Sequence, residues 1–311
     1  MHKTRKLTIA AGLLAVLALG AACGGDDGDN TASGDSSTGG GLSSAAAQPA
    51  AAEVQTLEAV VPGGEGGEFS FAATPDLVAG PVEISLVNHG ALEHQAMVMR
   101  FKPGADFGQF AAAAAGDPTG TSALALVEGF GGPNAAPPGE TRSATQVLEA
   151  GDYMMICLLP GADGAPHAVH GMVLPFTVAP SDGEVTADTP TGVEADAEVK
   201  LVDFGFVYEG PFSAGETLHV VNEGDQAHEF VAYKLDEGVS ADDFASAMES
   251  AAGPPPASAG TGIGMLAPGR ASDITLPDET GEYVLFCMLP DVAGDGLAHI
   301  GHGMLSETSI D

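Results

Sequence analysis

The sequence predicts an all-β protein made of two tandem Greek-key β-sandwiches, each with a short helical insert. Three observations support this prediction: an internal repeat that relates about 55–178 to about 196–310, short alternating segments separated by turn residues, and one Ala-rich stretch in each half. Short strands at this spacing favour an antiparallel sandwich or barrel over βαβ units.

The internal repeat rests on five features that recur in the same order. Each half has an alternating strand that ends in Asn and continues as Asn-x-Gly-x-x-x-His, an Ala-rich insert, a Gly-x-Tyr-x-x-x-Cys motif, and a Pro and Asp-Gly loop before His-x-x-His-Gly-Met. The residues at these positions are His94, Cys157, His167, His170 and Met172 in the first half, and His228, Cys287, His299, His302 and Met304 in the second. Agreement on so many rare residues indicates a duplication.

The predicted domain boundaries follow from composition. Residues 53–180 form the first predicted domain and 196–311 the second, and the polar, turn-rich residues 181–195 between them form a linker. Residues 24–52 are rich in Gly, Ser and Asp and have almost no large apolar side chains. Such a segment cannot bury enough surface to offset its ordering entropy, so we predict a disordered tether there.

Within the first half, five segments are predicted strands because they are β-branched or alternating and end at turn residues. They are 68–72, 81–88, 94–101, 152–158 and 173–178. The Ala-rich stretches 107–115 and 244–252 are predicted helices. Because Trp is absent and aromatic residues make up only 5% of the chain, the cores must rest on Val, Leu, Ile, Met and Phe.

Residues 1–23 have the pattern of a signal peptide. A basic start is followed by an apolar stretch from Leu7 to Leu19, which is too short to span a bilayer comfortably. The end, Gly20-Ala21-Ala22-Cys23, resembles a bacterial lipobox, whose cysteine is lipidated. We therefore expect an exported protein of the cell envelope, facing an oxidising compartment and anchored to the outer face of the membrane through lipidated Cys23.

The charge of the chain limits its partners. Forty-three acidic residues against nine Lys and Arg give a formal net charge of −34. Nucleic-acid binding is excluded because it depends on basic groups that neutralise phosphates. An anionic membrane surface would repel the chain, so membrane attachment must be covalent or hydrophobic. The same charge is most simply a solvated acidic surface that keeps the chain soluble, and it could also steer the chain toward a partner protein with a basic surface.

The repeated motifs supply a particular set of metal ligands. A soft thiolate, imidazoles and a weak thioether suit copper in an electron-transfer site. Cys157, His167 and Met172 come from one predicted loop, and His94 comes from a distant strand. A compact Cys/His/His set with a distant Met serves both Cu(I) and Cu(II), so little has to move when an electron is exchanged.

These motifs resemble those of the cupredoxin family, the plastocyanin- and azurin-like blue-copper proteins. The resemblance extends over about 55–178 and again over about 196–310, and it is strongest in Gly-x-Tyr-x-x-x-Cys and in the spacing from His167 to Met172. It implies one copper ion per domain in a type 1-like site that transfers electrons. The implied ligands are His94, Cys157, His167 and Met172 in the first domain, and His228, Cys287, His299 and Met304 in the second.

The loop between cysteine and histidine is longer than is usual in that family. Nine residues separate Cys157 from His167, and eleven separate the matching pair in the second half. The residues therefore leave His167 and His170 open as alternative ligands. We favour His167 because it keeps the family spacing to Met172, and we expect His170 and its counterpart His302 to act as outer groups that tune the site.

Other functions remain open from the sequence. The same fold without copper could serve as an envelope interaction module, or the protein could store or deliver copper. The cysteines could also be small core residues or pair as a disulfide between Cys157 and Cys287. A multicopper enzyme needs a second copper centre built from His-x-His pairs, and the chain contains none. We therefore predict that the protein is not an enzyme.

Overall fold

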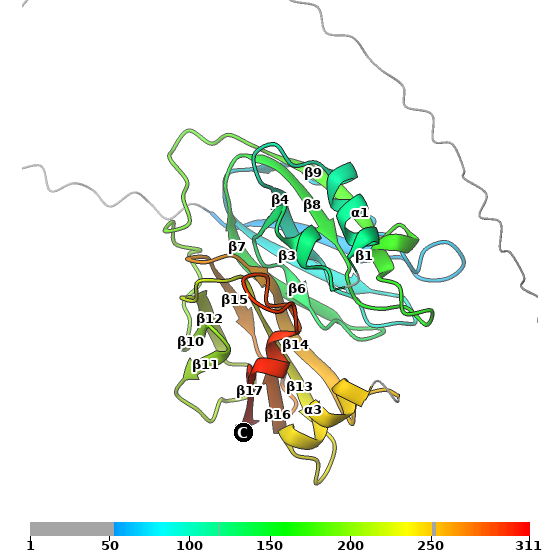
Figure 1. Cartoon of the computed structure of the whole chain (residues 1–311). Coiled ribbons are helices and arrows are strands. Elements are labelled where there is room, and N and C mark those ends of the chain that lie inside the picture. Colours follow the sequence, from blue (N-terminus) through cyan, green and yellow to red (C-terminus); the bar gives the residue numbers. More distant parts are fainter. Residues whose placement is uncertain (1–52, 118, 251–252) are drawn as a thin grey trace, which may run out of the picture. The chain divides into compact units, whose positions relative to one another are not determined.

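The computed structural model describes residues 53–117, 119–250 and 253–311 (Figure 1). These residues fall within one compact unit. The predicted signal peptide, its Cys23 and the predicted tether lie outside the described residues. Within the described ranges, no helix is both long enough and apolar enough to cross a membrane.

The part of the chain before residue 180 contributes to two facing groups of strands. One group contains β1 (Gln55–Val61), β3 (Gly80–Asn88) and β7 (Thr141–Leu148). The other, in order across the sheet, is β2 (Leu77–Val78), β9 (Val173–Ala179), β8 (Gly151–Ile156), β4 (Met97–Phe101) and β5 (Val127–Gly129). β1 runs parallel to β3, and β3 runs antiparallel to β7.

The part after residue 195 repeats this order. One group contains β11 (Gly205–Tyr208), β10 (Ala197–Val202), β12 (Thr217–Asn222) and β15 (Ala271–Thr275). The other contains β17 (Leu305–Ile310), β16 (Gly281–Phe286), β13 (His228–Leu235) and β14 (Ala257–Leu266), with β6 (Pro133–Asn134) at its edge. β10 runs parallel to β12, and β12 runs antiparallel to β15, as in the first half. The predicted all-β class is confirmed.

Helices are few and begin at recognisable caps. α1 (Phe107–Gly116) starts after Asp106, whose carboxylate accepts a hydrogen bond of 2.8 Å from the backbone of Gln109. α3 (Ala241–Ser250) begins three residues before the predicted start, because Ser240 and Asp243 hydrogen-bond each other's backbone N–H as a capping pair. The remaining helices are α2 (Thr121–Leu124) and two 3-10 turns, η1 (His167–His170) and η2 (His299–His302).

The predicted strand at 68–72 is wrong. The chain turns there instead, and the segment keeps a single bridge, between Ala72 and Val60. Gly63, Gly64 and Gly66 have φ angles of +70°, +68° and +85°, which favour glycine and bend the chain just before the segment. Because Glu68 lies in this turn and not in a strand, its carboxylate can contact His94, which belongs to a candidate metal site.

The alternating strands bury one face, as their sequence pattern predicts. In β3, Val82, Ile84 and Leu86 are fully buried, whereas the residues between them are partly exposed. A fully buried aliphatic side chain of this size contributes roughly 1.5–3 kcal/mol by its removal from water. The two halves use the same pattern, so each has apolar side chains behind its candidate site.

One sheet is continuous across the two halves. β7 pairs antiparallel with β15 through Gln146–Ser272, Thr145–Asp273 and Ala144–Ile274, and Figure 1 shows the two strands side by side. β6, which comes from the first half, pairs with β14 of the second. The backbone hydrogen bonds of each half are therefore completed in part by the other.

An ion-pair network lies at this junction. Arg270 of the second half is buried and contacts Glu128 and Glu149 of the first half at 2.9 and 3.1 Å. Arg100 contacts the same two carboxylates at 3.0 Å, and the Arg270 guanidinium lies 3.5 Å from the centre of the Phe130 ring. In a chain with so few cations, two arginines neutralise the two carboxylates where the halves meet.

The predicted linker, 181–195, contains no helix or strand, but its end is anchored. Thr191 is buried and its hydroxyl donates a hydrogen bond to Asp273 of β15. The other carboxylate oxygen of Asp273 contacts Nδ1 of His219 at 2.6 Å. This hydrogen bond raises the pKa of His219 above its usual 6.5, although partial burial opposes the shift.

The His219–Asp273 pair should therefore stabilise the fold in a pH-dependent way. Because the folded-state pKa of His219 is raised, the stabilisation is fully present below about pH 6.5 and is lost as the pH rises through the folded-state pKa. Since the His219 side chain is 37% exposed, we expect His219→Gln to lower the free energy of unfolding by only about 0.5 kcal/mol at low pH and by almost nothing at pH 9.

Urea denaturation at pH 5.5 and at pH 9 checks this expectation. The control is His89→Gln, which changes an exposed histidine and should have the same small effect at both pH values. An equal loss of stability from His219→Gln at both pH values would show that the pair does not act through the charge of the imidazole.

Candidate metal centres

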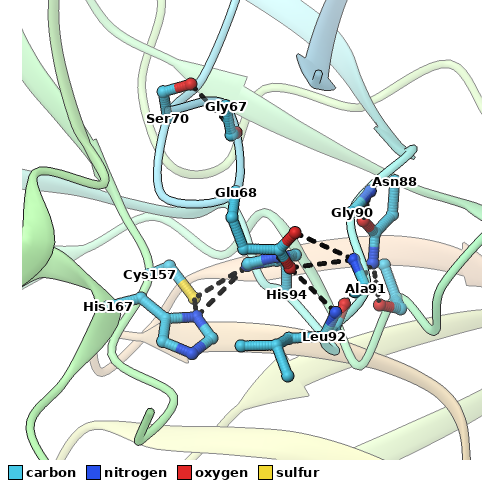
Figure 2. Close-up of polar contacts among 11 residues, drawn as sticks. Gly67, Glu68, Ser70, Asn88, Gly90, Ala91, Leu92, His94, Cys157 and His167 are labelled. Carbon is cyan, nitrogen blue, oxygen red and sulfur yellow. Dashed lines mark hydrogen bonds and ion pairs between the residues drawn. The ribbon is translucent and has the colours of Figure 1, made fainter. Parts of the chain in front are cut away.

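The first half brings together His94, Cys157 and His167, all buried (Figure 2). The two Nδ1 atoms lie 3.2 Å apart, and Cys157 Sγ lies 3.3 Å from Nδ1 of His167 and 4.0 Å from Nδ1 of His94. Metal–nitrogen and metal–sulfur bonds are about 2.0–2.3 Å long, so each separation is within the span of two such bonds. One ion can therefore contact all three atoms.

The second half brings together His228, Cys287 and His299 in the same way. The two Nδ1 atoms lie 3.0 Å apart, and Cys287 Sγ lies 3.4 Å from Nδ1 of His299. All three residues are completely buried. Both cysteines are free thiols, so the disulfide that the sequence left open is not formed.

The Asn-x-Gly-x-x-x-His motif forms a loop that places the upstream histidine. Asn88 donates from Nδ2 to the carbonyl groups of Leu92 and Ala136, at 2.8 and 2.9 Å, and accepts from the backbone of Gly90 at 2.8 Å. One side chain thus closes the turn that leads to His94. Asn222 repeats these contacts in the second half, with two donated bonds of 2.8 Å and one accepted bond of 3.0 Å.

A carboxylate that sequence reasoning missed orients each upstream histidine. Glu68 Oε1 lies 3.1 Å from Nε2 of His94, and Asp203 Oδ1 lies 2.8 Å from Nε2 of His228. A carboxylate at Nε2 keeps the proton there, so the Nδ1 lone pair faces the cysteine. The sequence does contain one sign of this contact. An acidic residue precedes the upstream histidine at nearly the same sequence separation in both halves, 26 positions in the first and 25 in the second.

The motif glycine leaves room for that carboxylate. A Cβ atom on Gly90 would lie 2.8 Å from Glu68 Oε1 and 3.0 Å from His94 Nε2. A Cβ atom on Gly224 would lie 2.5 Å from the Asp203 carboxylate. The small residue is therefore required by close approach of the carboxylate–histidine pair.

The Gly-x-Tyr-x-x-x-Cys motif fixes the strand that ends at the cysteine. The Tyr153 hydroxyl donates to the backbone carbonyl of Glu149 at 2.9 Å, and that of Tyr283 donates to Glu279 at 2.7 Å. Both rings are buried. Each tyrosine anchors the start of its strand, four residues before the cysteine.

The long loop folds back on itself without moving the ligands. Pro160 and Pro166 form an isolated β-bridge at the base of the loop, so that the residues between them make a closed turn. His167 then donates from its backbone to Leu159 at 2.9 Å, and Ala168 donates to Cys157 at 2.9 Å. The second half repeats this with a bridge between Pro290 and Ala298. The additional residues therefore leave the distance between cysteine and histidine short.

The methionines lie in the same backbone network. Met172 is buried, its N–H donates to His167 at 3.2 Å, and its carbonyl accepts from Cys157 at 3.2 Å. Met304 makes the matching bonds at 3.0 and 3.3 Å. Backbone hydrogen bonds thus tie cysteine, histidine and methionine into one unit in each half, and the thioether ligation of copper by both methionines stays a prediction.

The structure places His170 and His302 outside the two ligand groups. His170 is exposed and lies 3.3 Å from a carboxylate oxygen of Asp163. His302 lies 3.0 Å from Asp295. Both sit at the last position of a 3-10 turn whose first residue is the buried histidine, so the turn directs the two imidazoles differently.

Burial sets the charge of each group. It raises the pKa of the Cys157 thiol to about 12 and the pKa of Cys287 well above its usual 9.0. It also lowers the pKa of His167 and of His299 to about 4, with a contribution from the neighbouring histidine. At neutral pH the imidazoles are neutral and able to bind a metal, whereas each thiol must lose a proton to do so.

The donor set fits copper. Two neutral imidazole nitrogens that face each other cannot both donate a hydrogen bond, and carboxylates already hold the protons at Nε2 of the upstream histidines. A soft ion that accepts two nitrogens and one thiolate satisfies all three atoms. The geometry recurs in both halves, so the part of the chain that the structure describes holds two such groups.

No protein-family model and no curated protein matches the chain. Among solved structures, auracyanin from Roseiflexus castenholzii is 24% identical over 37% of this chain and 94% of its own, with a TM-score of 0.26. The copper-containing nitrite reductase of Thermus scotoductus is 16% identical over 83% of this chain and 61% of its own (TM-score 0.23). The blue copper oxidase of Nitrosomonas europaea is 14% identical over 83% and 86% (TM-score 0.22).

The prediction that this protein is not an enzyme is contradicted by these matches. The nitrite reductase and the blue copper oxidase, both enzymes, match over 83% of the chain. The prediction relied on the lack of His-x-His pairs, which tests only for ligands that are adjacent in sequence. Metal ligands are brought together by folding, as His94 and Cys157 are here, so we withdraw the exclusion of catalysis.

All the quoted identities are below 25% and the TM-scores are below 0.3. In each half, two sheets face each other, the upstream histidine precedes or begins one strand, and the cysteine and second histidine lie between the last two strands, as the sequence motifs implied. The fold is cupredoxin-like.

Metal binding should release protons from the thiols. Because both thiols are protonated at pH 7.5 and the imidazoles are neutral, loading two copper ions should release about two protons per chain. An indicator dye in weakly buffered solution measures the release. Cys157→Ser and Cys287→Ser should each remove about one proton from the total. Stoichiometric copper binding without proton release would show that the thiols are not ligands.

Proposed function

We propose that this chain is an exported copper protein with two tandem cupredoxin-like domains, 53–180 and 196–311, each holding a type 1-like copper site that transfers electrons. The observation behind this proposal is the convergence, in both halves, of two imidazole Nδ1 atoms and one cysteine Sγ in a completely buried space. When bound, copper supplies one-electron chemistry between Cu(I) and Cu(II).

The residues of each site have distinct tasks in this proposal. The proposed ligands are His94, Cys157, His167 and Met172 in the first domain, and His228, Cys287, His299 and Met304 in the second. Backbone hydrogen bonds link cysteine, histidine and methionine, so the ligands keep their positions when the charge of the site changes. Burial excludes water, which reduces the rearrangement that accompanies an electron exchange.

Burial also favours electron transfer over copper delivery. Passing an ion to another protein requires ligands that the receiving protein can reach and replace. The histidines and cysteines of both groups are at most 1% exposed. Electrons, in contrast, reach a buried ion without replacing any ligand.

Export, anchoring and partner choice extend the proposal. We propose lipidation of Cys23, which would hold the two domains at the outer face of the membrane in an oxidising cell envelope. A net charge of −34 supports a redox partner with a basic surface, since opposite charges accelerate encounter.

Absorption spectroscopy with Cu(II) tests the proposed function on the full chain. An intense thiolate-to-copper band should appear, and Cys157→Ser and Cys287→Ser should each reduce it by about half if the two sites contribute equally. A folded protein that binds no copper would instead support a copper-free interaction module.

A second experiment tests which loop histidine is the ligand. In a Cys287→Ser background, only the first site contributes to the band. His167→Ala should abolish that band or change its character, whereas His170→Ala, the matched control three residues away, should leave it in place and weaken binding at most about 10–100-fold. Loss of the band in His170→Ala alone would reverse the assignment.

A further inference from the structure

A buried polar pair joins the two halves next to the candidate metal sites. Glu229 of β13 directly follows the ligand His228, and Asn134 lies on β6 of the first half. Both side chains are buried, and Asn134 Nδ2 donates to Glu229 Oε2 at 3.3 Å. A buried carboxylate is costly, and the first half has the neutral Gln95 at the matching position. Placing the ligand therefore does not require a carboxylate here.

Glu229 reaches the cysteine of the second site through two hydrogen bonds. Its Oε1 accepts from the backbone N–H of Met288, the residue after Cys287, at 2.8 Å. Its own backbone N–H donates to Cys287 Sγ at 3.4 Å. The carboxylate thus contacts the cysteine strand on one side and Asn134 on the other.

Asn134 reaches the histidine of the first site. It lies two residues before Ala136, whose carbonyl accepts from the N–H of His94 at 3.0 Å and whose N–H donates to the carbonyl of His94 at 2.9 Å. A continuous path of covalent and hydrogen bonds therefore runs from Cys287 through Met288, Glu229 and Asn134 to His94. Every residue on it is buried except Met288, which is 38% exposed. The path contains covalent bonds and three hydrogen bonds of 2.8, 3.3 and 3.0 Å.

We infer that Glu229 and Asn134 conduct electrons between the two sites, so that the chain is an internal two-site relay. This inference rests on the proposed function. Electronic coupling decays more slowly through covalent and hydrogen bonds than across non-bonded gaps, and this path consists of covalent and hydrogen bonds alone. One electron moves: the ion at one site is oxidised, the ion at the other is reduced, no bond forms or breaks, and no proton is transferred.

The alternative is that the pair only holds the halves together. The structure offers a matched control for that role. Ser272 of β15 is buried and donates to the carbonyl of Thr145 at 3.0 Å, so it also joins the two halves, but it lies outside the path. A purely structural bridge would respond alike to the loss of either contact.

Rapid reduction of the fully oxidised, copper-loaded full chain tests the relay. A brief pulse of a small one-electron reductant, supplied below stoichiometry, reduces the sites in a second-order step. The electron then redistributes according to the two reduction potentials, which Cys157→Ser and Cys287→Ser measure for each site alone. Absorbance should show this redistribution as a phase whose rate does not depend on protein concentration, and both serine variants should lack it.

Asn134→Leu removes the bridge at similar volume and should slow this phase severalfold, while each thiolate band and potential stays in place. Asn134→Ser shortens the same side chain and should act in the same direction if the leucine variant folds poorly. Ser272→Ala should leave the rate unchanged. No concentration-independent phase in the wild type, or equal rates in Asn134→Leu and wild type, would overturn the relay and leave the proposed function standing. So would equal slowing in Ser272→Ala. Absence of the thiolate bands would overturn both.

Discussion

The confinement of two imidazole nitrogens and one thiol to a single buried point is the constraint on which each half of this protein depends. These groups lie within hydrogen-bond distance of one another and are shielded from water. A soft metal ion suits this point, because it can bind both imidazole nitrogens and the thiolate at once. The loops around each site contain hydrogen bonds that hold the two imidazole nitrogens and the thiol sulfur close together.

In each of these loops, a local hydrogen bond helps to position a ligand whose partner ligand is distant in the sequence. Asn88 closes the turn before one histidine, Glu68 holds the proton on its far nitrogen, and Gly90 leaves the space for that contact. Tyr153 fixes the strand that ends at the cysteine. Such supporting contacts restrict rotamers and hold ligands in place before the metal binds. The second half solves the same problem with Asn222, Asp203, Gly224 and Tyr283.

The halves depend on each other as well. They are connected by a continuous sheet, by an arginine–glutamate network, and by β6 of the first half, which pairs with β14 of the second. Burial of Arg270 between two carboxylates makes this junction sensitive to the loss of any member, because an uncompensated buried charge is expensive. The connection also places β6 at the edge of the second half's sheet, where Asn134 contacts Glu229 of β13.

The sequence by itself determined the strand-rich fold class and the histidines, cysteines and methionines of interest, and it favoured His167 over His170 without excluding either. These follow from local patterns: alternation, turn residues and ligand spacing. Only the tertiary structure decided that Glu68 lies in a turn rather than a strand and contacts His94, that the long loop closes at Pro160 and Pro166, and that Asn134 meets Glu229. Each of these contacts joins residues whose proximity depends on how the whole chain packs, and no local spacing encodes that distance.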